Sequence, residues 1–198
     1  MEVVSGIIMG LDTDKPETGN ALLEFVEQSR IALAAINLLQ ALPRTPLWDR
    51  LARENRLIHD EDRESNVDFL LPYDDVVNAW RQFMKIAFAP EAMFGRYRHQ
   101  VEYTYRNRIK VPVSPQLRSW ANIKRAVIML RNIVWKVGVR GDYRKVFWKF
   151  ALDCLRQRDL EGFISSTMVA HHAILYAREA AIGQANASNY SLRMREAA

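Results

Sequence analysis

Apolar residues follow two different patterns along this chain, and the first pattern occupies the N-terminal region. Residues 3–9 form a short, partly β-branched apolar run without helical periodicity, and Gly10 ends it, which predicts a buried strand followed by a turn. A helix is predicted to begin at Pro16, because apolar side chains then recur at three- and four-residue spacing. A second apolar run, residues 31–42, predicts another strand before a helix that begins at Pro46. Such an arrangement joins two parallel strands.

From Tyr73 onward, the apolar spacing is helical throughout. The first of these helices ends before Pro90, where a second helix begins. Tryptophan and tyrosine residues at this spacing are expected in the core. The apolar stripe of the first helix is Val76, Val77, Trp80, Phe83, Met84 and Ala87. The inward positions of the second are Met93, Phe94, Tyr97, Val101 and Tyr105.

Three further helices are predicted after a break at residues 111–115, where Ser114 and Pro115 suit the start of a long helix. The apolar positions of that helix are Leu117, Trp120, Ile123, Val127, Leu130 and Val134. Apolar spacing then predicts helices over residues 143–154 and 159–182. The chain is therefore predicted to be mainly α, with a bundle of about five or six helices after a short N-terminal parallel βαβ unit.

An acidic stretch, residues 57–71, separates the two patterns. Its run 59–65 has no periodicity and is predicted to be a solvated linker. The run lacks the central glycine and the terminal bidentate glutamate of a calcium loop, although four carboxylates offer hard oxygen ligands: Asp60, Glu61, Asp62 and Glu64. The predicted divisions are the βαβ segment 1–56, the linker 57–71, a helical domain 72–186 and a disordered tail 187–198.

Three short motifs carry a family resemblance. They are Gly6-Ile7-Ile8-Met9-Gly10, Pro16-Glu17-Thr18 and the run from Leu38 to Leu47. Together they resemble the fifth and sixth strands of a radical S-adenosylmethionine (SAM) barrel, as in cobalamin-binding proteins of the hopanoid-methylase type. In that family a helical C-terminal domain of unassigned role follows the barrel. Asn66-Val67 and residues 71–90 are similar to its joining segment and first helices, and the resemblance covers residues 3 to about 180.

The resemblance assigns cofactor-facing positions on the first strand. It implies that three residues lie against the SAM adenine: Gly6, Ile8 and Gly10. Glycine admits a planar base to the backbone, and isoleucine gives the base an apolar surface. Without the resemblance, strand packing and turn chemistry would account for both glycines.

On the second strand, the resemblance implies that the family contacts adenine through backbone groups near Leu39, Gln40 and Ala41. The turn that follows departs from the family pattern. The family usually has glycine between the proline and the threonine of this turn, whereas this chain has Arg44. The resemblance therefore predicts the strand but not the shape of the turn that follows it.

Cofactor chemistry in the resembled family depends on residues that this sequence does not contain. The family binds SAM, cobalamin and a four-iron four-sulfur cluster, which it holds with three cysteines at C-x-x-x-C-x-x-C spacing. This sequence has one cysteine, Cys154, on an apolar stripe that predicts a buried, inert thiol. We therefore expect no catalytic or metal-binding residue here, and no cofactor bound to this chain alone.

The resemblance also implies a parent protein. We expect the chain to be the C-terminal portion of a radical SAM enzyme that methylates an unactivated carbon, and to be inactive by itself. It would complete the SAM pocket and cover the substrate cavity. Its partner would be the missing N-terminal barrel with the cobalamin-binding portion.

Charge is distributed unevenly. Residues 95–158 hold sixteen Lys or Arg against three Asp or Glu, whereas residues 1–94 hold nine against sixteen. A basic field of this strength attracts anions. The candidate anion-binding residues are Arg96, Arg98, Arg106, Arg108, Lys124, Arg125, Arg144 and Lys145.

Three interpretations of this basic region stay open. Its cations can face the acidic first half or a missing domain. They can contact a membrane surface or an acidic lipid headgroup. With Tyr103 and Tyr105 among them, they can also bind nucleic acid, although no helix-turn-helix, zinc-finger or RNA-platform signature supports this. A non-catalytic helical module that binds an anionic partner is therefore the alternative function.

Composition is that of an ordinary globular protein. There is no secretory signal, no run of about eighteen apolar residues and no disulfide framework, so we expect a cytoplasmic location, with membrane-surface contact under the second interpretation. The adjacent His171 and His172 would point about 100° apart on a helix and cannot share a metal ion. Two strands without further neighbours have open apolar edges, which predicts a homo-oligomer.

Overall fold

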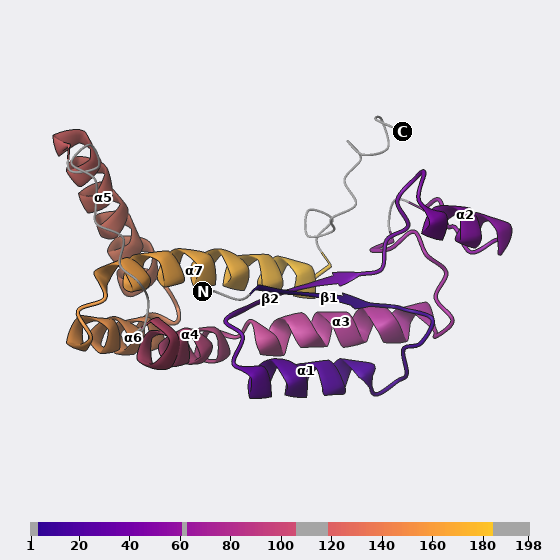
Figure 1. Cartoon of the computed structure of the whole chain (residues 1–198), viewed down its shortest axis with the longest axis horizontal. Coiled ribbons are helices and arrows are strands. Elements are labelled where there is room, and N and C mark those ends of the chain that lie inside the picture. The colour runs from indigo at the N-terminus through magenta and orange to yellow at the C-terminus, as the bar shows by residue number, and fades with distance from the viewer. Residues whose placement is uncertain (1–3, 61–62, 106–118, 184–198) are drawn as a thin grey trace. The chain divides into compact units, whose positions relative to one another are not determined.

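The computed structural model describes residues 4–60, 63–105 and 119–183. It divides into two compact units: a βαβ unit, residues 4–89 with 175–183, and a helical unit, residues 90–174 (Figure 1). The boundary by contacts therefore falls at residue 90, beyond the predicted linker 57–71. The location of the family's domain boundary at residues 57–71 stays a prediction. The predicted tail, 187–198, lies outside the described residues.

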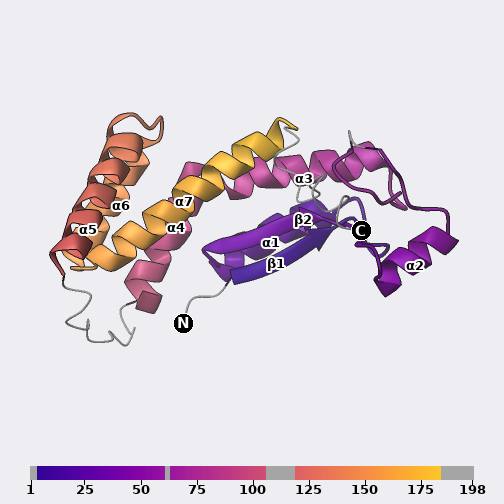
Figure 2. The same cartoon turned by 90° about the horizontal axis from the view of Figure 1, so that it is seen from above.

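Two parallel strands form the centre of the βαβ unit. β1 (Val4–Met9) pairs with β2 (Leu33–Leu38), and α1 (Thr18–Ser29) connects them. Figure 2 shows the two arrows side by side, pointing the same way. The described residues contain seven α-helices and this one two-stranded sheet, so the prediction of a mainly α chain with a short parallel βαβ unit is confirmed.

The turn after β2 leads into α2 (Pro46–Arg53), which begins with proline in its first turn. Thr45 caps this helix, because its Oγ1 accepts a hydrogen bond from the backbone N–H of Trp48 at 3.3 Å. Arg44 has a φ of +64°. The turn thus keeps the left-handed conformation that favours glycine, although an arginine stands there.

One face of the sheet packs on helices. α3 (Tyr73–Ala87) contacts both α1 and β2, and Figure 1 shows α1 and α3 on the same side of the strands. The indole Nε1 of Trp80 donates a hydrogen bond to the carbonyl oxygen of Ile36 at 3.2 Å. All six residues of the stripe predicted for this helix are buried. The core of the βαβ unit therefore lies between α3, α1 and one face of the sheet.

The helical unit begins with α4 (Pro90–His99), which continues into the π-helical segment η1 (Gln100–Thr104). It also contains α6 (Arg144–Arg156) and the first part of α7 (Leu160–Ala181). Aromatic rings fill its core: the centroids of Phe94 and Phe150 are 5.3 Å apart, and those of Phe147 and Phe163 are 5.6 Å apart. The predicted inward residues of the second helix, from Met93 to Tyr105, are all buried, which confirms that stripe.

α5 (Trp120–Ile133) and its π-helical continuation η4 (Val134–Val139) differ from the other helices of this unit. Figure 1 shows α5 leading away from α6. Trp120 is 79% exposed, so the expectation that this tryptophan lies in the core is wrong, and the apolar side chains of Val127 and Ile123 are 60% and 46% exposed. The predicted start of this helix at Ser114 and Pro115 falls outside the described residues.

Candidate functional site

The sheet of the βαβ unit has a second face, which is open. Gly6 and Ile8 project onto it from β1, opposite Ala35 and Asn37 of β2. Ile8 is 50% exposed, and a Cβ added to Gly6 would meet no atom within 4 Å. Packing among the described residues therefore gives no reason for glycine at this position. A glycine inside a strand without such a reason suits the close approach of a ligand or another backbone.

Gly10, at the end of β1, has structural reasons of its own. Its φ is +94°, and a Cβ added here would lie 2.5 Å from the ring of Phe69. Its backbone N–H donates a hydrogen bond to Asp14 Oδ2 at 2.7 Å, which holds the turn after β1. Turn chemistry thus accounts for Gly10, whereas it does not account for Gly6.

The carboxyl end of β2 is joined to a later segment of the chain by side-chain hydrogen bonds. The carboxamide of Asn66 accepts from Ala41 N at 2.9 Å and donates to Ala41 O at 2.8 Å. Ser65 Oγ donates to Leu39 O at 2.6 Å, and Gln40 Nε2 donates to Glu64 O at 2.6 Å. All three residues predicted on the second strand are therefore in contact with residues 64–66.

Sequence reasoning missed the structural role of Ser65 and Asn66, which are 1% and 6% exposed. The end of the acidic run is packed rather than solvated: the Glu64 carboxylate also forms an ion pair with Arg81 at 3.2 Å. Two other carboxylates considered for a cation, those of Glu61 and Asp62, lie outside the described residues. The available signal was the similarity of Asn66-Val67 to the family's joining segment.

Asp12, in the turn after β1, forms ion pairs with two arginines in and just after α2. Its carboxylate lies 2.9 Å from Arg50 of α2 and 2.7 Å from Arg56. The hydrogen bond from Arg56 lowers the pKa of Asp12 below its ordinary value and raises the pKa of Arg56. The loops at the carboxyl ends of both strands are thus held in place by charge pairs as well as by Asn66.

The predicted anion-binding residues occupy several places in the helical unit. Arg98 of α4 and Lys145 of α6 line one pocket, whereas Arg96 is buried and its Nη2 lies 3.0 Å from Met93 Sδ. Two others, Lys124 and Arg125, are exposed on α5, and Arg144 is exposed at the start of α6. The remaining two, Arg106 and Arg108, lie outside the described residues.

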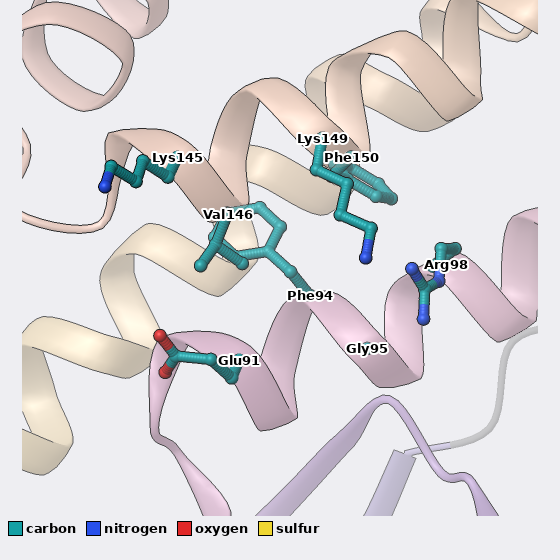
Figure 3. Close-up of a pocket in the computed structure, with 8 residues that line it drawn as sticks. All are labelled: Glu91, Phe94, Gly95, Arg98, Lys145, Val146, Lys149 and Phe150. Carbon is teal, nitrogen blue, oxygen red and sulfur yellow. The ribbon is translucent and has the colours of Figure 1, made fainter.

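The pocket lies between α4 and α6 and has a volume of about 350 Å³. Its apolar lining comes from Phe94, Val146 and Phe150. Figure 3 shows Arg98 and Lys149 pointing toward one another at one end of it, while Glu91 and Lys145 lie at the other end. Arg98 and Lys145, the two predicted anion-binding residues that line this pocket, thus lie at its opposite ends.

The cysteine and one histidine of the helical unit are buried or in contact with neighbouring side chains. Cys154 is 1% exposed, which confirms that it is buried, and burial raises the pKa of its thiol to about 12. His171 Nδ1 lies 2.6 Å from the hydroxyl of Tyr143. No group of three or more metal-ligating side chains occurs in the described part of the chain. None of the helices described there has the length and hydrophobicity needed to cross a bilayer.

The architecture is that of a βαβ unit with an open sheet face, followed in sequence by a helical domain. Comparison with known proteins identifies the family to which this architecture belongs. The profile described as "Domain of unknown function (DUF4070)" matches residues 45–186. The chain belongs to this family. No solved structure matches the chain.

Two curated relatives are similar over most of this chain. A hopanoid C-2 methylase of Rhodopseudomonas palustris is 61% identical over 198 residues, which is 100% of this chain and 37% of the relative. An uncharacterized methyltransferase of Synechocystis is 30% identical over 179 residues, 85% of this chain and 32% of the relative. The chain thus spans about a third of the length of these relatives. The predicted resemblance to proteins of the hopanoid-methylase type is confirmed.

Proposed function

We propose that the βαβ unit forms the end of the SAM-binding barrel of a radical SAM methylase, whose remaining strands and cluster cysteines belong to the rest of the polypeptide. The observation that carries this proposal is the open face at Gly6, where an added Cβ would meet no atom of the described residues within 4 Å. The 61% identity to a hopanoid C-2 methylase over the whole chain supports it.

The residues of this chain would bind and orient SAM, which supplies the reactive group when bound. The absence of a Cβ at Gly6 leaves room for the adenine ring, and the half-exposed Ile8 offers it an apolar surface. The backbone N–H of Ala41 is already donated to Asn66, so Leu39, Gln40 and Ala41 would form the rim of the site. The single cysteine cannot supply the three cluster ligands, and no residue here is assigned to cobalamin.

The test is a chimera in which this chain replaces the matching part of the Rhodopseudomonas methylase. The unmodified chimera is expected to bind SAM and to form the methylated hopanoid. Gly6→Leu is expected to weaken SAM binding at least tenfold, because its side chain would fill the adenine space, a loss of about 1.4 kcal/mol or more. Equilibrium dialysis with labelled SAM measures the affinity, and mass spectrometry measures the product.

The matched control is Asn20→Leu, which adds a similar side chain on the exposed surface of α1. It should leave SAM affinity unchanged. If a folded Gly6→Leu chimera bound SAM like the unmodified chimera, the open face would not face the cofactor. An unmodified chimera that folded but failed to bind SAM would contradict the barrel assignment itself.

A second candidate function rests on α5. We propose that the helical unit binds an anionic membrane surface through this helix. Trp120, Ile123 and Val127 form an exposed apolar stripe, with Lys124 and Arg131 beside it, and α5 contains no acidic residue. Exposed tryptophan with flanking basic residues is typical of helices that lie in the interface of an anionic bilayer.

Cosedimentation with lipid vesicles tests the second candidate. The chain is expected to bind phosphatidylglycerol vesicles and not phosphatidylcholine vesicles, and to be released by added salt because exposed charges are screened. Val127→Glu should abolish binding, whereas Leu70→Glu, an equal change at a 67% exposed position of the βαβ unit, should not. Tighter binding to a polynucleotide than to the vesicles would favour nucleic acid. A dimer that loses its association on Val127→Glu would instead favour a second copy of the chain.

A further inference from the structure

The pocket between α4 and α6 has a pair of cations at one end without counter-charges. Arg98 comes from α4 and Lys149 from α6, and Figure 3 shows their charged ends directed toward one another. Among the described residues, neither side chain has an ion-pair partner within 4 Å. Both side chains are exposed, and an anion bound between them would offset the repulsion of their like charges. This end of the pocket is therefore suited to a negatively charged group.

The middle of the pocket is apolar. The side chains of Phe94 and Phe150 form part of its lining, and each is only 2% exposed because the two rings pack against one another. Val146 adds a further apolar surface beside them (Figure 3). The apolar surface left for a ligand is therefore that of the half-buried Val146 and the space beside Gly95, which an anion with an apolar body would cover and a small inorganic anion would not.

Glycine at position 95 keeps the pocket open. Gly95 lies within α4, where glycine is unfavourable for helix formation, and a Cβ added to it would meet nothing within 4 Å. Packing among residues 4–60, 63–105 and 119–183 therefore does not require this glycine. A larger residue here would project into the space that the pocket provides.

We propose that this pocket binds the anionic group and adjoining hydrocarbon of a small amphiphile, of the chemical class of single-chain phosphate monoesters. Arginine pairs with phosphate oxygens through its planar guanidinium, and lysine adds a compact positive charge. The phosphate lies between Arg98 and Lys149, and the hydrocarbon lies along Val146 and the space beside Gly95. At the other end, the charges of Glu91 and Lys145 are opposite, so the end at Arg98 and Lys149 is the one that attracts the anionic group.

Calorimetric titration of the whole chain with octyl phosphate, below its micellar concentration and at low salt, tests this site. We expect saturable binding of one molecule per chain. Inorganic phosphate, which lacks the hydrocarbon, should bind at least tenfold more weakly, and octyl glucoside, which lacks the charge, should not bind. These arms separate a phosphate-ester amphiphile from free phosphate and from a non-specific detergent effect.

Variants locate the site. Lys149→Glu and Arg98→Glu are each expected to weaken octyl phosphate binding at least tenfold. Lys85→Glu makes a similar change of charge at an exposed position of α3 and should leave the affinity unchanged. Equal losses in all three variants would show a general charge effect and would overturn the assignment.

Gly95→Leu tests the apolar part of the pocket without changing charge. It should abolish octyl phosphate binding, while the circular dichroism spectrum and the melting temperature show that the helical unit remains folded. Gly95→Ala should keep the fold and weaken binding less, because its methyl group fills less space. The proposal fails if the folded Gly95→Leu variant binds octyl phosphate with unchanged affinity, or if inorganic phosphate binds as tightly as octyl phosphate.

Discussion

α3 and α5 carry apolar stripes of similar spacing, but the chain buries one and exposes the other. In α3, Phe83 is 0% and Trp80 3% exposed, because α1 and β2 cover the stripe. In α5, Trp120 is 79% exposed, and no helix covers it in the described residues. Apolar spacing thus predicts a helix and the face it offers, but not whether the covering partner belongs to the same chain. The two faces of the sheet repeat this contrast.

The largest loss of stability is expected in α3, whose apolar stripe is covered. Phe83→Ala removes a fully buried ring from between α3 and its neighbours, and should lower the free energy of unfolding of the βαβ unit by about 3–5 kcal/mol. Denaturant titration followed by tryptophan fluorescence measures this, because Trp80 lies in the same helix. A loss below about 1 kcal/mol would mean that α3 does not hold this core together, and the contrast with α5 would disappear.

A smaller effect is expected at the end of β2. Asn66→Ala removes both hydrogen bonds to Ala41 and leaves a buried N–H and a buried C=O without their partner, which should cost about 1–3 kcal/mol. Asn20→Ala is the matched control, because Asn20 is exposed on α1 and should change stability little. Urea denaturation of both variants measures the difference. Equal stabilities would mean that water replaces the carboxamide and that this end of β2 is open.

The elements of this fold were predictable where the determining residues are close in sequence. The stripe of α3 and the inward residues of α4 follow from spacing alone, and Pro46 with Thr45 marks the start of α2. The contacts of Asn66 were not predictable, because its partner Ala41 lies 25 residues away and nothing local indicates the pair. The pocket residue Lys149 was missed for a similar reason, since only the packing of α6 on α4 brings it to Arg98.

The candidate site itself was predictable only through the family resemblance. Spacing gives no reason to separate Gly6 from Gly10, since both look like ordinary strand and turn glycines. The structure separates them, because Gly10 has a positive φ and packs against Phe69, while a Cβ at Gly6 would have no described atom within 4 Å. What fills that space is not encoded in the local sequence, just as the covering of α5 is not.

A pH-dependent effect is expected where charge pairs hold the loops beside the site. Arg56 lowers the pKa of Asp12 from 3.8, so this carboxylate contributes stability above about pH 4 and loses it as pH falls through its lowered pKa. Asp12→Asn should therefore cost about 1 kcal/mol at neutral pH and progressively less toward about pH 2. Denaturant midpoints across this range measure the difference. A cost that stayed constant with pH would mean that Asp12 acts through its shape rather than its charge.

The smallest change in stability is expected in α5, whose apolar stripe is exposed. Trp120→Ala should change the free energy of unfolding by less than about 0.5 kcal/mol, because a side chain that is 79% exposed has few contacts to lose. The same substitution should weaken binding to phosphatidylglycerol vesicles, since it removes the largest apolar group of the exposed stripe. Paired measurements of denaturation and vesicle cosedimentation test both statements. A loss of about 2 kcal/mol or more in the free energy of unfolding would show that the stripe of α5 is covered in solution. Both helices would then have a covering partner, and the contrast between α3 and α5 would disappear.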